Sequence, residues 1–80
     1  MKTKLVFSTE KEDFEHWFHL PMVPRLKEWV NVQDILKPEE ILKIKESAFC
    51  WSSERGSIQS VEYRYDKKAY YVEVFIWCED

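Results

Sequence analysis

Hydrophobic and polar residues alternate along two segments near the start of the chain, residues 2–8 and 14–20. Successive side chains of a strand point to opposite faces, so each alternating segment predicts a half-buried strand. In the second segment one face carries Phe14, His16, Phe18 and Leu20, and the other carries Glu15, Trp17 and His19. The charged residues 9–13 predict a turn that joins the two strands into a hairpin. Pro21 and Pro24 end the pairing, because proline has no N–H to donate to a ladder.

The period changes to that of a helix over residues 38–47. Pro38 suits the first turn of a helix, and the two glutamates that follow it suit the positive end of the helix dipole. Ile41 and Ile44 recur at helical spacing and begin an apolar stripe that continues to Ala48. Short strands are predicted on either side of this helix, at residues 29–32 and 49–52, with a turn at 53–57.

The last third of the chain predicts a second hairpin, with strands at residues 58–65 and 69–78 that are rich in β-branched and aromatic residues. A tight connection would set Glu62 opposite Glu73, and a two-residue slip would set Arg64 there instead. Both registers remain open, and both give the same two faces. The face predicted to enter the core carries Val61, Tyr63, Val72, Val74 and Ile76, joined by Phe18 and Leu20 from the earlier strand.

These elements predict an α+β fold in a single domain, residues 1–80. We expect a strongly curled antiparallel sheet or a small, partly open β-barrel of five to six strands, with the helix at 38–47 inserted before the last hairpin. Curling reduces the exposed edges that a small sheet tolerates poorly. Eighty residues hold one core, and four Trp, four Tyr and five Phe supply its bulk. A flat sheet with the helix across one face is the alternative.

The turn between the second and third predicted strands has a distinctive pattern. Residues 18–25 read FHLPMVPR, and Glu28, Trp29 and Val30 follow. This run, together with the VEYRY…YYVEVFIW hairpin, resembles short uncharacterised bacterial proteins in which a Leu-Pro-x-x-Pro-Arg turn joins two strands. The likeness covers residues 14–32 and 58–78. It supports the predicted fold and implies no activity, cofactor or functional residue for this chain.

Charge and hydropathy limit the classes of partner. The formal net charge is -3, from twelve basic and fifteen acidic residues that are spread along the chain, whereas duplex-binding proteins concentrate Lys and Arg on one face. No segment reaches membrane-spanning length, and the N-terminal residues lack the apolar run of a signal peptide. We therefore expect a cytoplasmic protein without a membrane partner, in which Cys50 and Cys78 are reduced thiols.

Metal and catalytic sites find no support in the residue spacing. His16 and His19 are three residues apart, which places them on opposite faces of a strand. Neither a C-x-x-C nor an H-x-x-x-H pair occurs, and no nucleophile signature surrounds Cys50. The single glycine excludes a phosphate-cradling loop. We predict no catalytic residue, no cofactor and no metal, and hence a protein that is not an enzyme.

The surplus of aromatic residues is more informative. In the last hairpin, the face opposite the predicted core carries Tyr71, Phe75 and Trp77, and Trp17 points away from the core face of its own strand. Amphipathic helices usually dock within their own domain, so we expect the helix to cover the Tyr71, Phe75 and Trp77 face. The alternative is an exposed aromatic patch that contacts a partner, in which Trp17, Tyr71 and Trp77 are the candidate binding residues.

By elimination, the sequence predicts a small non-enzymatic protein-interaction domain that binds another protein or a second copy of itself. The second hypothesis is stacking of single-stranded nucleic acid on barrel aromatics, for which Arg64, Lys67 and Lys68 form only a small basic cluster. The third is an acidic inhibitor of the phage type, which would occupy the nucleic-acid channel of a target. It rests on size and charge alone.

Overall fold

The structure is a computed structural model that describes residues 2–21, 24–67 and 69–80. In these residues the elements are β1 (Lys2–Ser8), β2 (Asp13–His19), β3 (Trp29–Asn31), the 3-10 turn η1 (Val32–Asp34), α1 (Pro38–Ser47), β4 (Arg55–Asp66) and β5 (Ala69–Trp77). Met22 and Val23 of the predicted Pro-containing turn, and Lys68 of the predicted basic cluster, lie outside the described residues. The bounds of α1 confirm the predicted helix.

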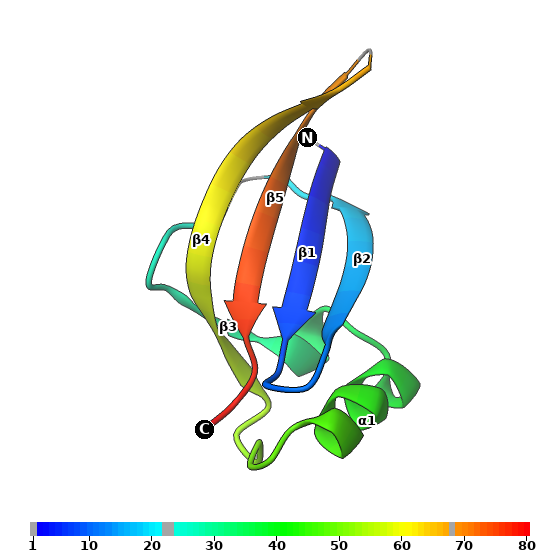
Figure 1. Ribbon diagram of the computed structural model, residues 1–80, viewed down its shortest axis with the longest axis vertical. Coiled ribbons are helices and arrows are strands. Elements are labelled where there is room, and N and C mark those ends of the chain that lie inside the picture. The colour runs from blue at the N-terminus through cyan, green and yellow to red at the C-terminus, as the bar shows by residue number, and fades with distance from the viewer. Residues whose placement is uncertain (1, 22–23, 68) are drawn as a thin grey trace.

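The strands form one strongly curled sheet in the order β2-β1-β5-β4-β3, which confirms an α+β half-barrel (Figure 1). The prediction of a wholly antiparallel sheet is wrong, because β1 and β5 run parallel, from Thr3 beside Val72 to Ser8 beside Trp77. The β4–β5 hairpin returns β5 to the middle of the sheet, next to β1. A central strand has neighbours on both sides, which suits the nearly continuous apolar run of β5.

The core lies between the inner face of the sheet and the helical segments. Figure 1 shows α1 at the end of the sheet where β1 and β5 finish. Ile41 and Ile44 of α1 belong to one buried cluster, to which η1 contributes Val32. The strands contribute inner-face residues that are no more than 1% exposed: Leu5, Phe7, Ile58, Val72, Val74 and Ile76.

Three of the predicted core residues, Val72, Val74 and Ile76, are fully buried, but Tyr63 is not. Phe18, Leu20 and Val61 are partly buried against the core cluster. Tyr63 is 70% exposed, so its assignment to the core is wrong. β4 has twelve residues and β5 nine, against seven in β1, and the hairpin rises past the end of β1 (Figure 1). Tyr63 lies just before this projecting part, opposite Val72 at the level of Thr3, on the stretch of β4 that does not pair with β3.

The register of the hairpin is the tight one, with Glu62 opposite Glu73 and Tyr65 opposite Tyr70, so the two-residue slip is wrong. A β-bulge between Ile58 and Ser60 then shifts the pairing by one residue. Ile58 therefore lies opposite Ile76 and enters the core, whereas uninterrupted alternation would have placed it on the other face.

Two local predictions around residue 50 are also wrong. Residues 49–52 form a loop and not a strand, because the N–H groups of Phe49 and Cys50 donate to the Glu79 carboxylate, at 3.1 and 3.2 Å, in place of a neighbouring strand. Residues 55–57, predicted as part of a turn, begin β4 and pair with β3. Gly56 allows this close packing, since a Cβ atom there would overlap Cγ2 of Ile76.

Candidate functional site

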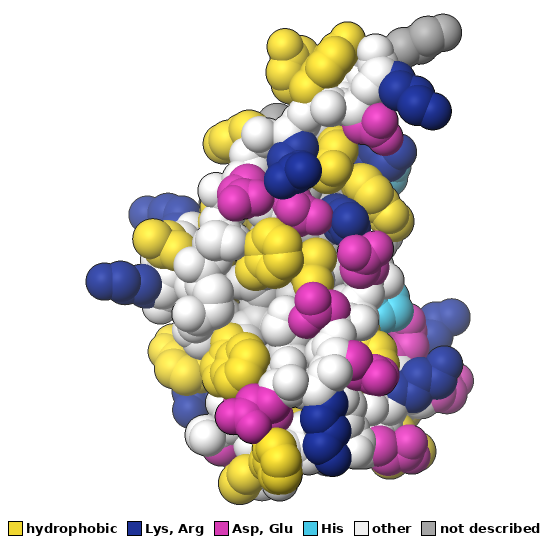
Figure 2. All heavy atoms as spheres, in the orientation of Figure 1, with side chains coloured by type: hydrophobic (Ala, Val, Ile, Leu, Met, Phe, Trp, Pro, Cys, Tyr) yellow, Lys and Arg dark blue, Asp and Glu magenta, His cyan; other side chains and the backbone are white. Residues whose placement is uncertain are grey.

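The outer face of the sheet, which points away from α1, carries five aromatic side chains. They are Trp17, Trp29, Tyr71, Phe75 and Trp77, and we call this set the outer aromatic face. Because α1 packs against the inner-face residues, the expectation that it covers Tyr71, Phe75 and Trp77 is wrong. In the view of Figure 2, hydrophobic side chains lie over the sheet between acidic and basic ones.

Trp17 and Tyr71 lie together, although their strands are separated by β1. Their ring centroids are 5.1 Å apart in an edge-on arrangement. The ammonium groups of Lys2 and Lys4 lie 4.8 and 5.8 Å from the Trp17 ring, within the range of cation–π attraction. Trp17 is 49% exposed and Tyr71 is partly buried. Trp77 is the third predicted binding residue, and it lies near the other end of β5 on the same face.

Charged side chains lie beside this aromatic pair, in a row that crosses the sheet from β2 to β4. The register sets Trp17, Lys4, Glu73 and Glu62 side by side. Lys4 Nζ contacts Glu15 and Glu73 at 3.1 and 3.2 Å, and Arg64 contacts Glu62 and Glu73 at 3.3 and 3.7 Å. The two cations thus offset the repulsion between the opposed glutamates.

Neighbouring groups raise the pKa of both Lys4 and Arg64. Hydrogen bonding to Glu15, followed by the other carboxylate contacts, raises the pKa of Lys4 although burial acts to lower it. The Tyr71 hydroxyl, and then the charge of Glu73, raise the pKa of Arg64. Glu73 is only 7% exposed, and a carboxylate removed from water requires such partners.

Trp29 and three tyrosines are exposed as well, although they were not predicted to be surface residues. Trp29 is 60% exposed, with the Arg55 guanidinium 5.1 Å from its ring, and Ser57 separates it from Trp77 across the sheet. Alternation over residues 29–32 contained that signal, since it turns both valines to the side opposite Trp29. The tyrosines are on the projecting hairpin: Tyr63, Tyr65 and Tyr70, at 70, 61 and 75% exposure. The greater length of β4 and β5, compared with β1 and β3, was the signal that these tyrosines would be exposed.

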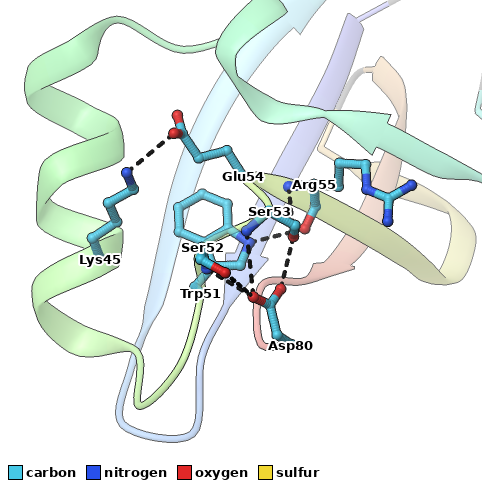
Figure 3. Close-up of polar contacts among 7 residues, drawn as sticks. All are labelled: Lys45, Trp51, Ser52, Ser53, Glu54, Arg55 and Asp80. Carbon is cyan, nitrogen blue, oxygen red and sulfur yellow. Dashed lines mark hydrogen bonds and ion pairs between the residues drawn. The ribbon is translucent and has the colours of Figure 1, made fainter.

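A second polar cluster lies where the last residues meet the loop before β4. The Asp80 carboxylate accepts hydrogen bonds from the Ser52 N–H at 2.7 Å and from the Ser53 hydroxyl at 2.7 Å (Figure 3). The indole N–H of Trp51 donates to the Arg55 carbonyl at 2.9 Å. The hydrogen bonds that Asp80 accepts, led by the one from the Ser53 hydroxyl, lower the pKa of Asp80 to about 2. The cluster holds the loop before β4 against the last residue of the sequence. The Ser52 N–H and the Ser53 hydroxyl already donate to Asp80, so they are not free to bind an external anion.

Asp80→Asn should remove part of the acid sensitivity of the fold. The pKa of Asp80 is about 2 in the folded chain against 3.8 ordinarily, so its stabilising contribution is complete above 3.8 and is lost as the pH falls towards 2. Thermal melts between pH 7 and pH 2 should show a smaller loss for this variant than for the unmodified chain. Asp66→Asn, at the distant hairpin, is the control. Equal pH profiles for both variants would contradict the contribution of Asp80.

Cys50 is exposed and Cys78 is buried, both as free thiols, and burial raises the pKa of Cys78 to about 12. No group of three or more His, Cys, Asp and Glu residues lies close enough to hold a metal ion in the part that the structure describes. A hollow of about 380 Å³ beside α1 is bordered by the Lys45–Glu54 ion pair and an apolar floor. No helix among the described residues is long and apolar enough to cross a membrane.

Comparison of the chain with protein families, with curated proteins and with solved structures found no match. The resemblance to bacterial proteins with a Leu-Pro-x-x-Pro-Arg turn therefore stays a prediction. The geometry of the outer aromatic face is the basis for a functional proposal.

Proposed function

We propose that this chain is a non-enzymatic protein-interaction domain that binds its partner through the outer aromatic face. The observation that carries the proposal is the exposure of Trp17 and Trp29, at 49 and 60%, on a sheet face that α1 leaves uncovered. Exposed indole rings add little to the stability of a monomer. Trp and Tyr are enriched among the residues that contribute most to protein interfaces.

The charge arrangement favours a protein partner over single-stranded nucleic acid. Stacking of bases on aromatic rings requires nearby cations that are free to bind phosphates. Lys4 and Arg64, in the middle of the outer face, are each within 4 Å of two carboxylates of the same chain. A face that mixes aromatic rings with internally paired charges is better suited to a protein surface with satisfied polar groups.

The cytoplasm remains the location that we propose, because it agrees with two free thiols. The acidic-inhibitor hypothesis is less favoured than the interaction domain, because acids and bases are interleaved on the outer face where an inhibitor would need a continuous acidic surface.

Trp17→Ala should leave the fold intact and weaken partner binding by about thirtyfold, the equivalent of about 2 kcal/mol for a hot-spot residue. A photo-crosslinking amino acid at position 17, introduced in cells that naturally express the chain, identifies the partner. Titration calorimetry with the purified partner then compares the variant with the unmodified chain. Phe49→Ala is the matched control, because Phe49 is 72% exposed but lies on a loop beside Lys11.

Three results would decide against this proposal. One is equal crosslinking from positions 17 and 49. Another is a Trp17→Ala variant that unfolds, which would make Trp17 a structural residue. The third is a folded variant that loses salt-sensitive binding to single-stranded oligonucleotides, which would favour the nucleic-acid hypothesis.

A further inference from the structure

The projecting half of β4 is an open edge of the sheet. β3 pairs with β4 only over Arg55–Ser57, and the preceding loop extends the contact to Ile58 through hydrogen bonds of 2.8 and 2.9 Å with Glu28 and Lys27. Beyond Ile58, β5 is the only strand that pairs with β4 in the described residues. Alternate backbone N–H and C=O groups of residues 59–66 therefore face away from the sheet, and such an edge is a template for another strand.

We propose that a second copy of this chain pairs with this edge in antiparallel fashion, so that the two β4 strands join two half-barrels into one continuous sheet. Strand addition at an exposed edge gives affinity through main-chain hydrogen bonds and specificity through side chains. The resulting dimer has a twofold axis, and the same residues of each chain contact one another. This inference concerns the β4 edge and does not depend on the function proposed for the outer aromatic face.

The charges of β4 select one register for this pairing. When Tyr63 lies opposite Tyr63 of the second copy, Glu62 lies opposite the second copy's Arg64, and Arg64 opposite its Glu62. If the twofold axis passes through residue 62, Glu62 lies opposite Glu62 of the second copy. If it passes through residue 64, Arg64 lies opposite the second copy's Arg64. Directly opposed like charges are destabilising, whereas opposite charges attract. Centring on Tyr65 would also oppose Arg64 to Asp66, but it would pair only the end of the strand.

The inner side of the same register is apolar. It sets Val61 opposite Tyr65 of the second copy, and both tyrosines of this edge are more than 60% exposed in the single chain. A hollow of about 350 Å³ beside Val61 and Tyr63, bordered by residues 24–26, lies on the side where that ring would pack. Pairing would thus bury the aromatic rings that the projecting part of β4 leaves in water.

Charge reversal tests the register with purified protein. Glu62→Arg sets two arginines against two arginines, and Arg64→Glu sets two glutamates against two glutamates, so each variant alone should be monomeric in sedimentation equilibrium. An equimolar mixture restores both opposite-charge pairs and should form a heterodimer. The double variant Glu62→Arg/Arg64→Glu should dimerise like the unmodified chain. Lys45→Glu, a charge reversal on α1, is the control and should not change the association.

Crosslinking tests the same register independently of charge. Residues directly opposite in an antiparallel pair have Cβ atoms about 4.5–5.5 Å apart, within the span of a short thiol-reactive crosslinker. With Cys50→Ser as the background, Tyr63→Cys should form a covalent dimer with such a crosslinker, and Val61→Cys should not. An unmodified chain that stays monomeric at sub-millimolar concentration would overturn the proposal. So would a mixture of the two charge variants that stays monomeric while circular dichroism shows both folded. If either charge variant is unfolded, the cysteine pair decides, and failure of Tyr63→Cys to crosslink overturns the proposal.

Discussion

Phe7→Ala is expected to lower the free energy of unfolding by about 3–5 kcal/mol, the range for removing a buried aromatic ring. Phe7 is 0% exposed, it lies between Phe14 of β2 and Ile76 of β5, and its ring is 5.9 Å from that of His16. A small domain has only about 5 kcal/mol of stability or little more, so the variant should be largely unfolded at physiological temperature.

Urea unfolding followed by circular dichroism measures this loss. Phe49→Ala is the control, because Phe49 is 72% exposed and its removal should change stability by less than about 0.5 kcal/mol. Similar losses for the two variants would place Phe7 outside the core and would reverse the two faces of the sheet. Such a result would also remove the argument that Trp17 faces outwards, since β1 and β2 share one register.

The helix and the faces of the strands could be predicted from the sequence because local signals specify both. Pro38 and the glutamates after it begin α1 at the predicted residue, and the N–H of Lys37 donates to the Glu40 carboxylate at 3.2 Å. Alternation likewise assigned Val72, Val74 and Ile76 to the core, and each is 0% exposed. Neither signal requires knowledge of which strands are neighbours.

The features that the sequence did not reveal depend on long-range pairing. The alternation of β1 and β5 is the same whether they run parallel or antiparallel, so the mixed order of the sheet has no local signature. The bulge that turns Ile58 into the core adds a residue without changing the composition of the strand. Tyr63 has the residue type and periodicity of a core position, and only the long-range pairing determines that β3, whose pairing with β4 ends at Ser57, does not reach it.

The candidate site was predictable to the same extent. The outward orientation of Trp17 follows from alternation in β2, and that of Tyr71 from alternation in β5. Their ring centroids are 5.1 Å apart across β1, the strand between them, whose side chains beside the two rings are lysines. This contact depends on the order of the strands in the sheet. The sequence therefore predicts four members of the outer aromatic face, all except Trp29, but not their adjacency.

The outer aromatic face and the β4 edge are geometrically compatible as separate interaction surfaces. Trp17 is on β2, at the opposite side of the sheet from β4, so pairing of two β4 strands would leave Trp17 and Tyr71 uncovered. A dimer would then present two copies of the outer aromatic face on one extended sheet. Two linked binding sites can strengthen the attachment to a partner that carries repeated epitopes.

Lys4→Met is expected to reduce the free energy of unfolding by about 1–3 kcal/mol, the cost of leaving a buried polar group without its partner. The Glu73 side chain is 10% exposed and lies 3.2 Å from Lys4, and after the substitution only Arg64, at 3.7 Å, would remain as its cation. The double variant Lys4→Met/Glu73→Gln removes both charges and should recover most of the loss, because a buried pair is costly mainly when one partner is left behind.

Lys45→Met provides the matched control for this cycle. It breaks an ion pair of nearly the same length, 3.1 Å to Glu54, but the side chains of that pair are 40 and 30% exposed, and exposed pairs contribute less than about 1 kcal/mol. Urea unfolding of Lys4→Met, Glu73→Gln, the double variant and the unmodified chain gives the coupling energy between Lys4 and Glu73, and Lys45→Met is measured beside them. A loss for Lys4→Met no larger than that for Lys45→Met would mean that water already solvates Glu73. Lys4 would then be held mainly by Glu15, and because Lys2 already lies 4.8 Å from the Trp17 ring, the charge argument against the nucleic-acid hypothesis would be weaker.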